Sequence, residues 1–282
     1  MKRVALLGSP VAHSLSPVIQ NTAFRVAGLD WCYEAIETDA EGLEPAIQRM
    51  RAEVWPGANV TIPLKEAVMP LLDELDPSAV EVSAVNTVVN EGGHLVGHNT
   101  DSSGFMRDLR ALWRVPAQGL AVILGAGGAA RAVAAGLARQ GLELVLIARS
   151  PGRAGMLAED IRRTHAAEVG VLPWIGESFA QVPDHCVLIV NATPLGTAPA
   201  DQDMPWPVEV PLPPGAVVYD LVYTPKETRF RQYARQSGLQ SIPGGGMLLE
   251  QGALSYERWT GRCAPRRQMR AALRRALERL DA

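Results

Sequence analysis

The sequence has few cysteines and no long apolar run. Its three cysteines, Cys32, Cys186 and Cys263, are far apart and form no C-x-x-C pair. This spacing argues against a disulfide framework or a structural zinc site and is typical of proteins from a reducing cytoplasm. No segment approaches the roughly eighteen apolar residues of a membrane span, and the apolar run before Gly8 is too short for a signal peptide. We therefore expect a cytoplasmic protein with no membrane contact and no bound metal.

Neither sign of charge dominates the sequence. Lysine and arginine total 27, aspartate and glutamate total 30, and the formal net charge is -3. This balance provides no general attraction to nucleic acid, so we expect a small molecule as the partner. The arginines of RRQMRAALRRALERL are interpreted as the solvated face of an amphipathic helix. Hydrophobic residues at 47% and charged residues at 20% are ordinary globular usage and exclude a disordered chain.

The 282 residues instead show an alternation of short apolar runs and helical patterns. VALLG, WCYEAIET and GANVTIP predict strands, and AVNTVVNEGGHLVGHNTD predicts a hairpin around Gly92 and Gly93. The stretch SPVIQNTAFRVAGL predicts a helix with Ser16 as N-cap and Pro17 at the first position. LKEAVMPLLDEL predicts another helix, over residues 64–75.

Apolar runs become denser beyond Leu120, at AVILG, LELVLIA, HCVLIVNA and AVVYDLVY. Strands that are apolar on both faces and separated by helices indicate parallel βαβ units with a covered sheet. The chain is therefore predicted to form two α/β domains, with a boundary near residues 104–118.

A glycine-rich turn separates a predicted strand from a predicted helix in AVILGAGGAARAVAAGLARQG. Gly125, Gly127 and Ala130 fit the pattern G-x-G-x-x-[GA]. The first glycine permits a tight turn, the second lets the backbone approach a pyrophosphate, and the small third residue lets helix pack on strand. With both flanking elements present, the pattern predicts a dinucleotide site, and the alternative is a tight turn without a ligand.

The end of the next strand, LIARSPGR, carries residues that choose between NAD and NADP. An NAD site usually has an acidic residue there for the ribose 2′-hydroxyl. This sequence has Arg149, followed by Ser150 and Arg153. Guanidinium groups suit a 2′-phosphate dianion, so we expect NADP as the cofactor. Arg153 alone is also consistent with an arginine on a helix surface.

A second set of polar residues lies beside the strand ends of the first half. These residues are Ser14, Ser16, Asn59, Thr61, Lys65, Asn86, Asn99 and Asp101. The carboxyl ends of parallel strands line one rim, where ligands bind, so this set suits a small polyhydroxylated acid. Simpler explanations exist, because Ser16 or Asp101 can cap a helix. Asn86 can serve a turn, and Lys65 can open a surface helix.

Several sequence motifs, and their order along the chain, resemble those of the shikimate dehydrogenase family. They run along almost the whole chain: GSPVAHSLSP, GANVTIPLKE, AVNTV, NTD, GAGGAARA, NATPLG, YDLVY and GMLLEQGA. The resemblance implies NADP-dependent interconversion of shikimate and 3-dehydroshikimate, in the pathway to aromatic amino acids. It also implies a substrate-binding catalytic domain at 1–104, completed by 245–282, and a Rossmann-type NADP-binding domain at 105–244. A monomer or homodimer is expected.

Carried over position by position, the resemblance assigns a substrate site. Lys65 and Asp101 match the catalytic pair, in which a general base takes the hydroxyl proton while the cofactor takes the hydride. Ser14 and Ser16 match the serine pair that holds the substrate carboxylate. Further substrate contacts are expected from Asn59, Thr61, Asn86, Tyr223 and Gln251.

The resemblance assigns a cofactor site in the same way. The residues expected to bind the diphosphate are Gly125, Ala126, Gly127, Gly128 and Ala129. Arg149, Ser150 and Arg153 match the 2′-phosphate site, and Thr193, Leu221 and Gly244 are expected to complete the cofactor contacts.

Two departures from the family pattern matter. The family usually has Asn-Arg-Thr where this chain has Ala148, Arg149 and Ser150, so its NADP selectivity is expected to be weaker than usual. Ser102 and Ser103 follow Asp101 where a glycine is common, which affects the helix start and leaves the carboxylate in place.

Other functions are consistent with this sequence. A quinate/shikimate or aminoshikimate dehydrogenase would use the same scaffold. A non-catalytic dinucleotide sensor is a remote alternative, since a sensor has no need of the Lys65 and Asp101 pair.

Overall fold

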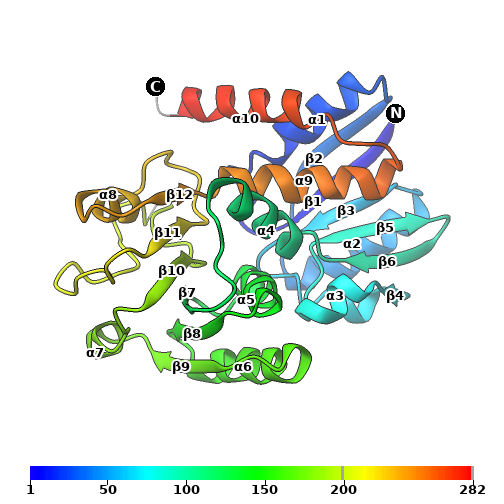
Figure 1. Cartoon of the computed structure of the whole chain (residues 1–282). Coiled ribbons are helices and arrows are strands. Elements are labelled where there is room, and N and C mark those ends of the chain that lie inside the picture. The colour runs from blue at the N-terminus through cyan, green and yellow to red at the C-terminus, as the bar shows by residue number, and fades with distance from the viewer. Residues whose placement is uncertain (198–199, 281–282) are drawn as a thin grey trace. The chain divides into compact units, whose positions relative to one another are not determined.

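The structure is a computed structural model that describes residues 1–197 and 200–280 (Figure 1). The chain divides into two compact units. The first combines Met1–Gly104 with Leu248–Glu278, and the second is built on Phe105–Met247. The first unit is thus made of two segments that are distant in the sequence.

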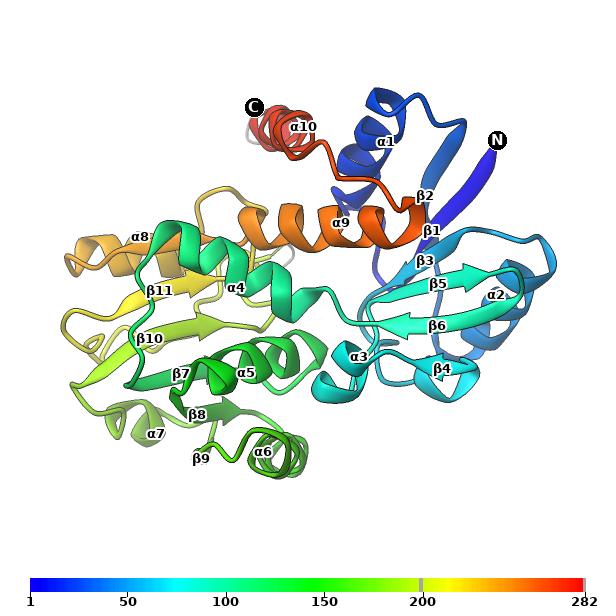
Figure 2. The same cartoon turned by 45° about the vertical axis from the view of Figure 1, so that its right-hand side comes forward.

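The first unit contains a six-stranded mixed sheet with the order β2-β1-β3-β5-β6-β4. Its strands are β1 (Lys2–Gly8), β2 (Trp31–Glu37), β3 (Gly57–Val60), β4 (Glu74–Leu75), β5 (Thr87–Glu91) and β6 (His94–His98). β1 pairs in parallel with β2 and β3, whereas β5 is antiparallel to both β3 and β6. Figure 2 shows β1, β3, β5 and β6 side by side. The antiparallel pair of β5 and β6 follows from the tight turn at Gly92 and Gly93, both of which have positive φ.

Helices cover both faces of this sheet. They are α1 (Ser16–Val26), α2 (Ala40–Ala52), α3 (Pro77–Val82), α9 (Gly245–Thr260) and α10 (Arg266–Leu280). On one face, Leu43, Ile47 and Met50 of α2 join Ala5 and Leu7 of β1 in a buried cluster. On the other face aromatic pairs form the packing. The ring centroids of Phe24 and Tyr256 are 5.8 Å apart, and those of Tyr33 and Trp259 are 6.1 Å apart.

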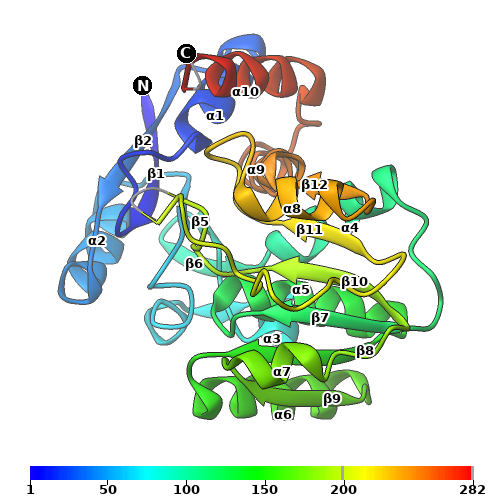
Figure 3. The ribbon, with the colours of Figure 1, turned by 90° about the vertical axis from the view of Figure 1, so that its left-hand side faces the viewer.

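The second unit contains a six-stranded sheet that is parallel throughout, with the order β12-β11-β10-β7-β8-β9. Figure 3 shows this order running from β12 at the top to β9 at the bottom. Its strands are β7 (Leu120–Leu124), β8 (Glu143–Ala148), β9 (Val169–Pro173), β10 (Cys186–Asn191), β11 (Val217–Asp220) and β12 (Ser241–Pro243). Its helices are α4 (Asp101–Leu112, which begins in the first unit), α5 (Gly128–Gln140), α6 (Pro151–His165), α7 (Gly176–Ala180) and α8 (Arg229–Gln236). The order 3-2-1-4-5-6, with β7 as strand 1, is that of a Rossmann fold.

The predicted class of two α/β domains is confirmed, and so is the hairpin, but two local predictions are wrong. Residues 64–75 form no α-helix; they contain a turn, a 3₁₀ helix η1 (Met69–Leu71) and β4. Pro70 explains this, because inside a helix it would lack the N–H for one hydrogen bond and its ring would clash with the preceding turn.

The second correction concerns Ser16. The N-cap of α1 is Leu15, and Ser16 is already the first helical residue. The hydroxyl oxygen of Ser14 accepts a hydrogen bond from the Ser16 N–H at 3.2 Å. The local cap is therefore supplied by the serine two residues earlier.

Among the described residues, no helix combines the length and apolar character that a membrane crossing requires.

Candidate active site

One edge of the first sheet gathers the polar residues that follow or precede its strands. Leu7 of β1 pairs with Val60 of β3, and Asn59 pairs with Thr87 at the start of β5. Thr87 also pairs with His98 at the end of β6. The carboxyl ends of β1, β3 and β6 therefore meet the amino end of β5. The rim predicted for a parallel sheet exists, although β5 reaches it from the opposite direction.

The backbone around Lys65 is fixed to this edge. The Thr61 N–H donates to the Leu7 carbonyl at 2.8 Å, and the Leu64 N–H donates to the Thr61 carbonyl at 2.8 Å. The Lys65 carbonyl accepts a hydrogen bond from the Val85 N–H, also at 2.8 Å. Lys65 thus lies on a turn held to two neighbouring segments and does not open a surface helix.

Lys65 and Asp101 form an ion pair in this position. The Lys65 Nζ is 2.5 Å from Asp101 Oδ2, and their side chains are 14% and 6% exposed. A lysine is seldom this buried without a partner, since removing its charge from water is costly. The pair therefore brings together the two residues that the sequence predicted as a proton-transfer pair.

Asn99 holds the start of α4, where Asp101 is the first residue. Its Oδ1 accepts from the backbone N–H groups of Asp101 and Ser102 at 3.1 and 3.2 Å. The simpler explanation of Asp101 as a helix cap is therefore wrong. The Asn99 side chain does the capping, which leaves both carboxylate oxygens of Asp101 for other partners.

Asn86 supplies the second partner of the Asp101 carboxylate. Its Nδ2 donates to Asp101 Oδ1 at 2.9 Å and to Thr100 Oγ1 at 2.8 Å. Its Oδ1 accepts from the Thr100 N–H at 2.7 Å. The Oε1 of Gln251 is also within 3.4 Å of Asn86 Nδ2. Asn86, Asp101, Lys65 and Gln251 therefore form one connected group.

Asn59 lies behind this group rather than beside it. It is buried, and its Nδ2 has three acceptors within 3.0 Å: the Asn86 carbonyl, Thr87 Oγ1 and Ser255 Oγ. Its Oδ1 accepts from the Tyr33 hydroxyl at 2.8 Å. Both polar ends of the amide are thus occupied by protein groups.

The remaining substrate residues occupy separate segments. Ser14 and Thr61 are partly exposed on the turns after β1 and β3, and Ser16 is nearly buried at the start of α1. Tyr223 follows β11 in the second unit.

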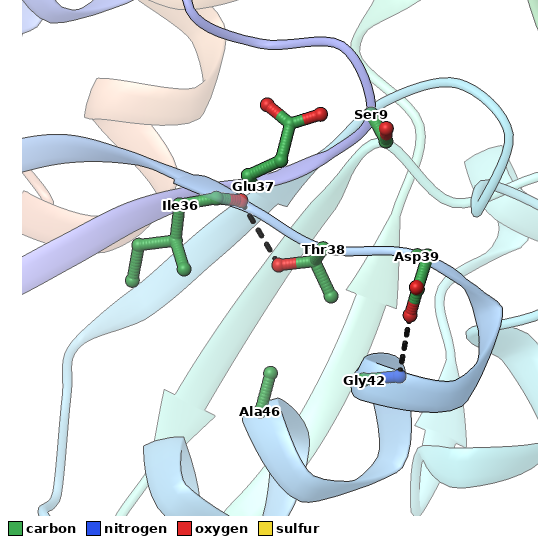
Figure 4. A pocket seen from close by; sticks show the side chains of 7 residues that line it. All are labelled: Ser9, Ile36, Glu37, Thr38, Asp39, Gly42 and Ala46. Carbon is green, nitrogen blue, oxygen red and sulfur yellow. Dashed lines mark hydrogen bonds between the residues drawn. The ribbon is translucent and has the colours of Figure 1, made fainter.

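A small hollow of about 260 Å³ lies beside the carboxyl end of β2 (Figure 4). It is lined by Ser9, Ile36, Glu37, Thr38, Asp39, Gly42 and Ala46. Its polar groups serve local structure. Asp39 caps α2 through the Gly42 N–H at 2.8 Å, and Thr38 donates to the Ile36 carbonyl at 2.9 Å. Glu37 Oε2 accepts from the Val11 N–H. None of the predicted site residues lines this hollow.

The glycine-rich turn of the second unit connects β7 to α5. Gly125 has a φ of +112°, and its N–H donates to the Ile147 carbonyl at 2.9 Å. Gly127 is the N-cap of α5, and a Cβ placed on it would meet no atom within 4 Å. The space beside Gly127 and the free N–H groups of the helix start suit a phosphate-bearing ligand. Ala130 is fully buried, as close packing of helix on strand requires.

Arg149 and Ser150 lie at the same edge, one strand away. Leu124 of β7 pairs with Ile147 of β8, so the two chains leave the sheet next to each other. Ser150 is the N-cap of α6, and its hydroxyl oxygen accepts from the Arg153 N–H at 3.5 Å. Arg149 and Arg153 are exposed. A helix start flanked by two guanidinium groups favours an anion.

The other predicted cofactor residues follow the next strands along this edge. Thr193 follows β10, Leu221 follows β11 and Gly244 follows β12. A Cβ on Gly244 would lie 2.1 Å from the Leu221 carbonyl oxygen, so only glycine fits there.

Two buried side chains fix the turns after β10 and β11. Asn191 Oδ1 accepts from the Thr193 N–H and hydroxyl at 3.0 and 2.6 Å, and its Nδ2 donates to Asp220 Oδ1 at 2.8 Å. Asp220 also accepts from the Thr228 hydroxyl at 2.6 Å and the Val222 N–H at 3.1 Å. Burial raises the pKa of Asp220, although these hydrogen bonds oppose the shift.

No three or more His, Cys, Asp and Glu side chains of the described residues are grouped so that they could hold a metal ion.

Sequence comparison decides the family. Residues 6–88 match the shikimate dehydrogenase substrate binding domain, and residues 244–274 match the shikimate 5'-dehydrogenase C-terminal domain. The chain is 46% identical over 279 residues to the shikimate dehydrogenase (NADP(+)) of Symbiobacterium thermophilum, covering 98% of this chain and 94% of that protein. The chain belongs to the shikimate dehydrogenase family.

Solved structures of this and related enzymes have the same fold. Shikimate 5-dehydrogenase from Thermus thermophilus, in complex with NADP(H) and shikimate, is 40% identical with a TM-score of 0.86, covering 98% of this chain and 100% of that chain. Quinate dehydrogenase from Corynebacterium glutamicum, in complex with NAD, is 30% identical with a TM-score of 0.87, covering 97% and 99%. The resemblance to shikimate dehydrogenases seen in the motifs is therefore confirmed at the level of the whole chain.

Ser102 and Ser103, which follow Asp101 where the family commonly has a glycine, leave the Lys65 and Asp101 pair intact. Ser102 is buried within the first turn of α4, and its N–H is held by Asn99. Gly104 is the position that cannot change, because a Cβ there would lie 2.6 Å from the backbone nitrogen of Gln251. The glycine lets the first turn of α4, which belongs to the first unit, lie close to Gln251, whose Oε1 is within 3.4 Å of Asn86 Nδ2.

Several buried hydroxyl residues beside the site were not predicted from the sequence. Thr87, Thr100 and Ser255 all lie behind Asn86. A usable signal was the spacing of Gln251 and Ser255, which places two polar residues on one face of a helix. Asn191 and Asp220 stand in recognisable motifs but were likewise not named.

Proposed function

We propose that this protein is an NADP-dependent shikimate dehydrogenase, which interconverts shikimate and 3-dehydroshikimate. The observation that carries the proposal is the nearly buried pair of Lys65 Nζ and Asp101 Oδ2, 2.5 Å apart, in a member of this family. Such a pair provides a positioned group for proton transfer, the step that a dehydrogenase must add to hydride transfer.

Lys65 is the proton-transfer residue. Its ammonium is anchored on one side by Asp101, whose other oxygen is held by Asn86. The carboxylate fixes the direction of the Nζ, and the neutral amine accepts the hydroxyl proton during oxidation. NADP supplies the hydride acceptor when it is bound.

The substrate is held by hydroxyls and amides around this pair. Ser14 and Ser16 bind its carboxylate, as in the family pattern. Ring hydroxyls are contacted by Thr61, Asn86, Gln251 and Tyr223, with Asn59 supporting the group from behind. These residue types can both donate and accept hydrogen bonds, as a polyhydroxylated acid requires.

The second unit binds NADP. The five residues of the diphosphate loop are Gly125, Ala126, Gly127, Gly128 and Ala129. The open space at Gly127 and the start of α5 fit the diphosphate, and the start of α6 with Arg149, Ser150 and Arg153 fits the 2′-phosphate. Thr193, Leu221 and Gly244 complete the cofactor contacts, with Leu221 and Gly244 near the nicotinamide.

The wider setting follows from the same proposal. The substrate domain comprises residues 1–104 and 245–282, and the cofactor domain comprises residues 105–244. The enzyme works in the cytoplasm, as a monomer or homodimer, in the pathway to aromatic amino acids. The intact proton-transfer pair argues against a dinucleotide sensor.

A quinate dehydrogenase is the second candidate, because the Corynebacterium glutamicum enzyme of that name has the same fold. Quinate is saturated and carries an additional hydroxyl at the carbon that bears the carboxylate. The Ser14 and Ser16 hydroxyls suit the flat, unsaturated ring of shikimate better.

Steady-state kinetics of the purified protein with shikimate and quinate, each with NADP and NAD, test the proposal. We expect the highest kcat/KM with shikimate and NADP, with a strong preference for shikimate. Comparable turnover of quinate would assign the protein to the second candidate, and no turnover of either acid would overturn both.

A further inference from the structure

We propose that three buried hydroxyls, those of Thr87, Thr100 and Ser255, form a positioning unit that sets the orientation of Asn86 and, through it, of Asp101. We call them the hydroxyl triangle. The inference rests on the proposed function, because it assigns a role in that reaction to residues that cannot touch the substrate.

The hydroxyl triangle is closed and buried. Thr87 Oγ1 is 2.8 Å from Ser255 Oγ and 3.3 Å from Thr100 Oγ1, and Thr100 Oγ1 is 3.2 Å from Ser255 Oγ. The three residues come from β5, from the turn before α4 and from α9. Thr87 and Ser255 are fully buried and Thr100 is nearly so. Their hydroxyls therefore act only through other protein groups.

Ser255 can only accept hydrogen bonds from the rest of the group. Its single proton is committed to the Gln251 carbonyl at 2.9 Å, since a carbonyl cannot donate. Its oxygen has two lone pairs, for which the Asn59 Nδ2 at 3.0 Å competes with the two threonine hydroxyls. When Asn59 donates to Ser255, at most one of the two threonine protons can be donated there as well.

A threonine proton that Ser255 does not accept has a nearer acceptor in Asn86 than in the other threonine. The Asn86 Oδ1 lies 3.0 Å from Thr87 Oγ1 and 3.1 Å from Thr100 Oγ1. The same oxygen accepts from the Thr100 backbone N–H, a donor that cannot reverse its role. The Thr100 N–H thereby identifies the oxygen end of the Asn86 amide, and Nδ2 donates to the Asp101 carboxylate and to Thr100 Oγ1.

The orientation of the amide matters for the proton-transfer pair. Asp101 Oδ1 receives the Asn86 Nδ2 while Asp101 Oδ2 holds Lys65. Without these hydroxyls the Asn86 amide keeps the Thr100 N–H and loses the threonine contacts at both of its ends, so it holds the carboxylate less firmly on the side opposite the lysine. Thr87, Thr100 and Ser255 are therefore positioning residues, and the return of α9 to the first unit completes the active site.

A pair of variants at one position separates the hydroxyl from the packing. Thr87→Val keeps the shape and removes the hydroxyl, whereas Thr87→Ser keeps the hydroxyl and removes a methyl group. We expect Thr87→Val to lower kcat/KM for shikimate about five- to tenfold, the range of one net hydrogen bond. Thr87→Ser should stay within about twofold of the parent enzyme, and the KM for NADP should be unchanged in both.

Ser255→Ala provides a second test from another element, with Thr260→Val as its matched control. Both residues lie on α9, and Thr260 donates to the Tyr256 carbonyl at 2.8 Å as Ser255 does to that of Gln251. Only Ser255 belongs to the hydroxyl triangle. We expect Ser255→Ala to lower kcat/KM for shikimate as Thr87→Val does, and Thr260→Val to leave it unchanged.

Crystal structures of Thr87→Val and Ser255→Ala give a readout that does not depend on activity. We expect the Asn86 amide to have turned from Asp101 in at least one of them. The inference is overturned if Asn86 keeps its contacts in both variants. It is also overturned if Thr87→Ser is as slow as Thr87→Val, or if Thr260→Val is as slow as Ser255→Ala. A parent protein that is inactive with shikimate would instead overturn the proposed function, before any variant is compared.

Discussion

Asp101 and Asp220 are two buried aspartates at the edge of a sheet, one in each unit, with different partners. Asp101 faces the ammonium of Lys65 at 2.5 Å. The hydrogen-bond donors of Asp220 are neutral: the Thr228 hydroxyl, the Asn191 amide and the Val222 N–H. Burial raises the pKa of Asp220, and the nearby charge of Arg231 offsets only part of that shift.

The difference indicates how one residue type serves two purposes. A carboxylate beside a lysine can hold and direct a proton-transfer group. A carboxylate among neutral donors ties two turns together, and its charge is a cost to the fold. The first arrangement is suited to chemistry on a substrate, and the second to fixing the turns that follow β10 and β11.

The largest effect is expected from breaking the pair at Lys65. Replacing Lys65 with Ala should lower kcat for shikimate oxidation by about 10²- to 10⁴-fold, the usual contribution of a positioned proton-transfer group. Binding of NADP, measured by titration, should barely change, because the residues predicted to bind it belong to the second unit. Lys2→Ala is the control, since Lys2 lies at the start of β1 and packs over Trp31. A Lys65→Ala enzyme that folds and turns over at the parent rate would remove Lys65 from the mechanism.

Asp101→Asn sharpens the same test. It replaces a charged partner by a neutral one, which should cost about 10- to 100-fold in kcat, as expected for a hydrogen bond to a charged group. Combining it with Lys65→Ala should cost little more than Lys65→Ala alone, since residues that act as a unit are non-additive. Two independent effects that multiply would contradict the pairing.

A smaller effect is expected at the 2′-phosphate site. Arg149→Asp should lower the ratio of kcat/KM for NADP to that for NAD by about 10- to 100-fold, because a charge-assisted bond is replaced by repulsion. Arg114→Asp makes the same charge change at an exposed position before β7. This position precedes the amino end of a strand, whereas Arg149 follows the carboxyl end of β8, so the variant should leave the ratio unchanged. If NAD were the better cofactor of the unmodified enzyme, the assignment of Arg149 would be wrong.

The smallest effect concerns stability at Asp220. Its pKa is raised in the folded state from a usual value of 3.8, so the folded state holds this proton more tightly than the unfolded chain does. The resulting stabilisation is present below the unfolded pKa and is lost as pH rises through the folded one. The free energy of unfolding of the parent, relative to Asp220→Asn, should therefore fall in urea titrations as the pH rises above the usual value of 3.8.

Asp160 offers a control of opposite sign. Burial opposes the shift, but hydrogen bonds from Arg131 and Arg163 hold the pKa of Asp160 below its usual value. The stabilisation from Asp160 is present above the unfolded pKa and is lost as pH falls, so Asp160→Asn should be most damaging near neutral pH. Equal pH dependence in the two variants would contradict the contrast between them.

The sequence was sufficient for much of the fold. Apolar runs predicted β1, β2 and β3, and β7, β8, β10 and β11 of the second sheet, because a strand covered on both faces must be apolar throughout. The helix predicted over residues 64–75 failed because Pro70 outweighs the apolar spacing around it. Ser16 failed as a cap because Ser14, two residues earlier, already provides the hydroxyl.

The sequence predicted the charged members of the site more readily than its supports. Lys65 and Asp101 stand in the motifs GANVTIPLKE and NTD and are charged, so the sequence alone marks them as candidates. Thr87 and Ser255 are ordinary hydroxyl residues separated by more than 160 positions, and their 2.8 Å contact depends on how α9 packs on the sheet. A contact of this kind is a property of tertiary structure, and local pattern does not reveal it.

The first unit is discontinuous, and this has a consequence for its biosynthesis. Residues 1–104 leave the ribosome before Phe105–Met247, which takes roughly 7 to 30 s to make at about 5 to 20 residues per second. During that interval Gly57 and Val88 lack their contact with the indole of Trp259, whose Nε1 donates to the Val88 carbonyl at 2.9 Å in the folded protein. The second unit can therefore fold first, and the first unit gains the contacts of Ser255 and Trp259 only when α9 emerges.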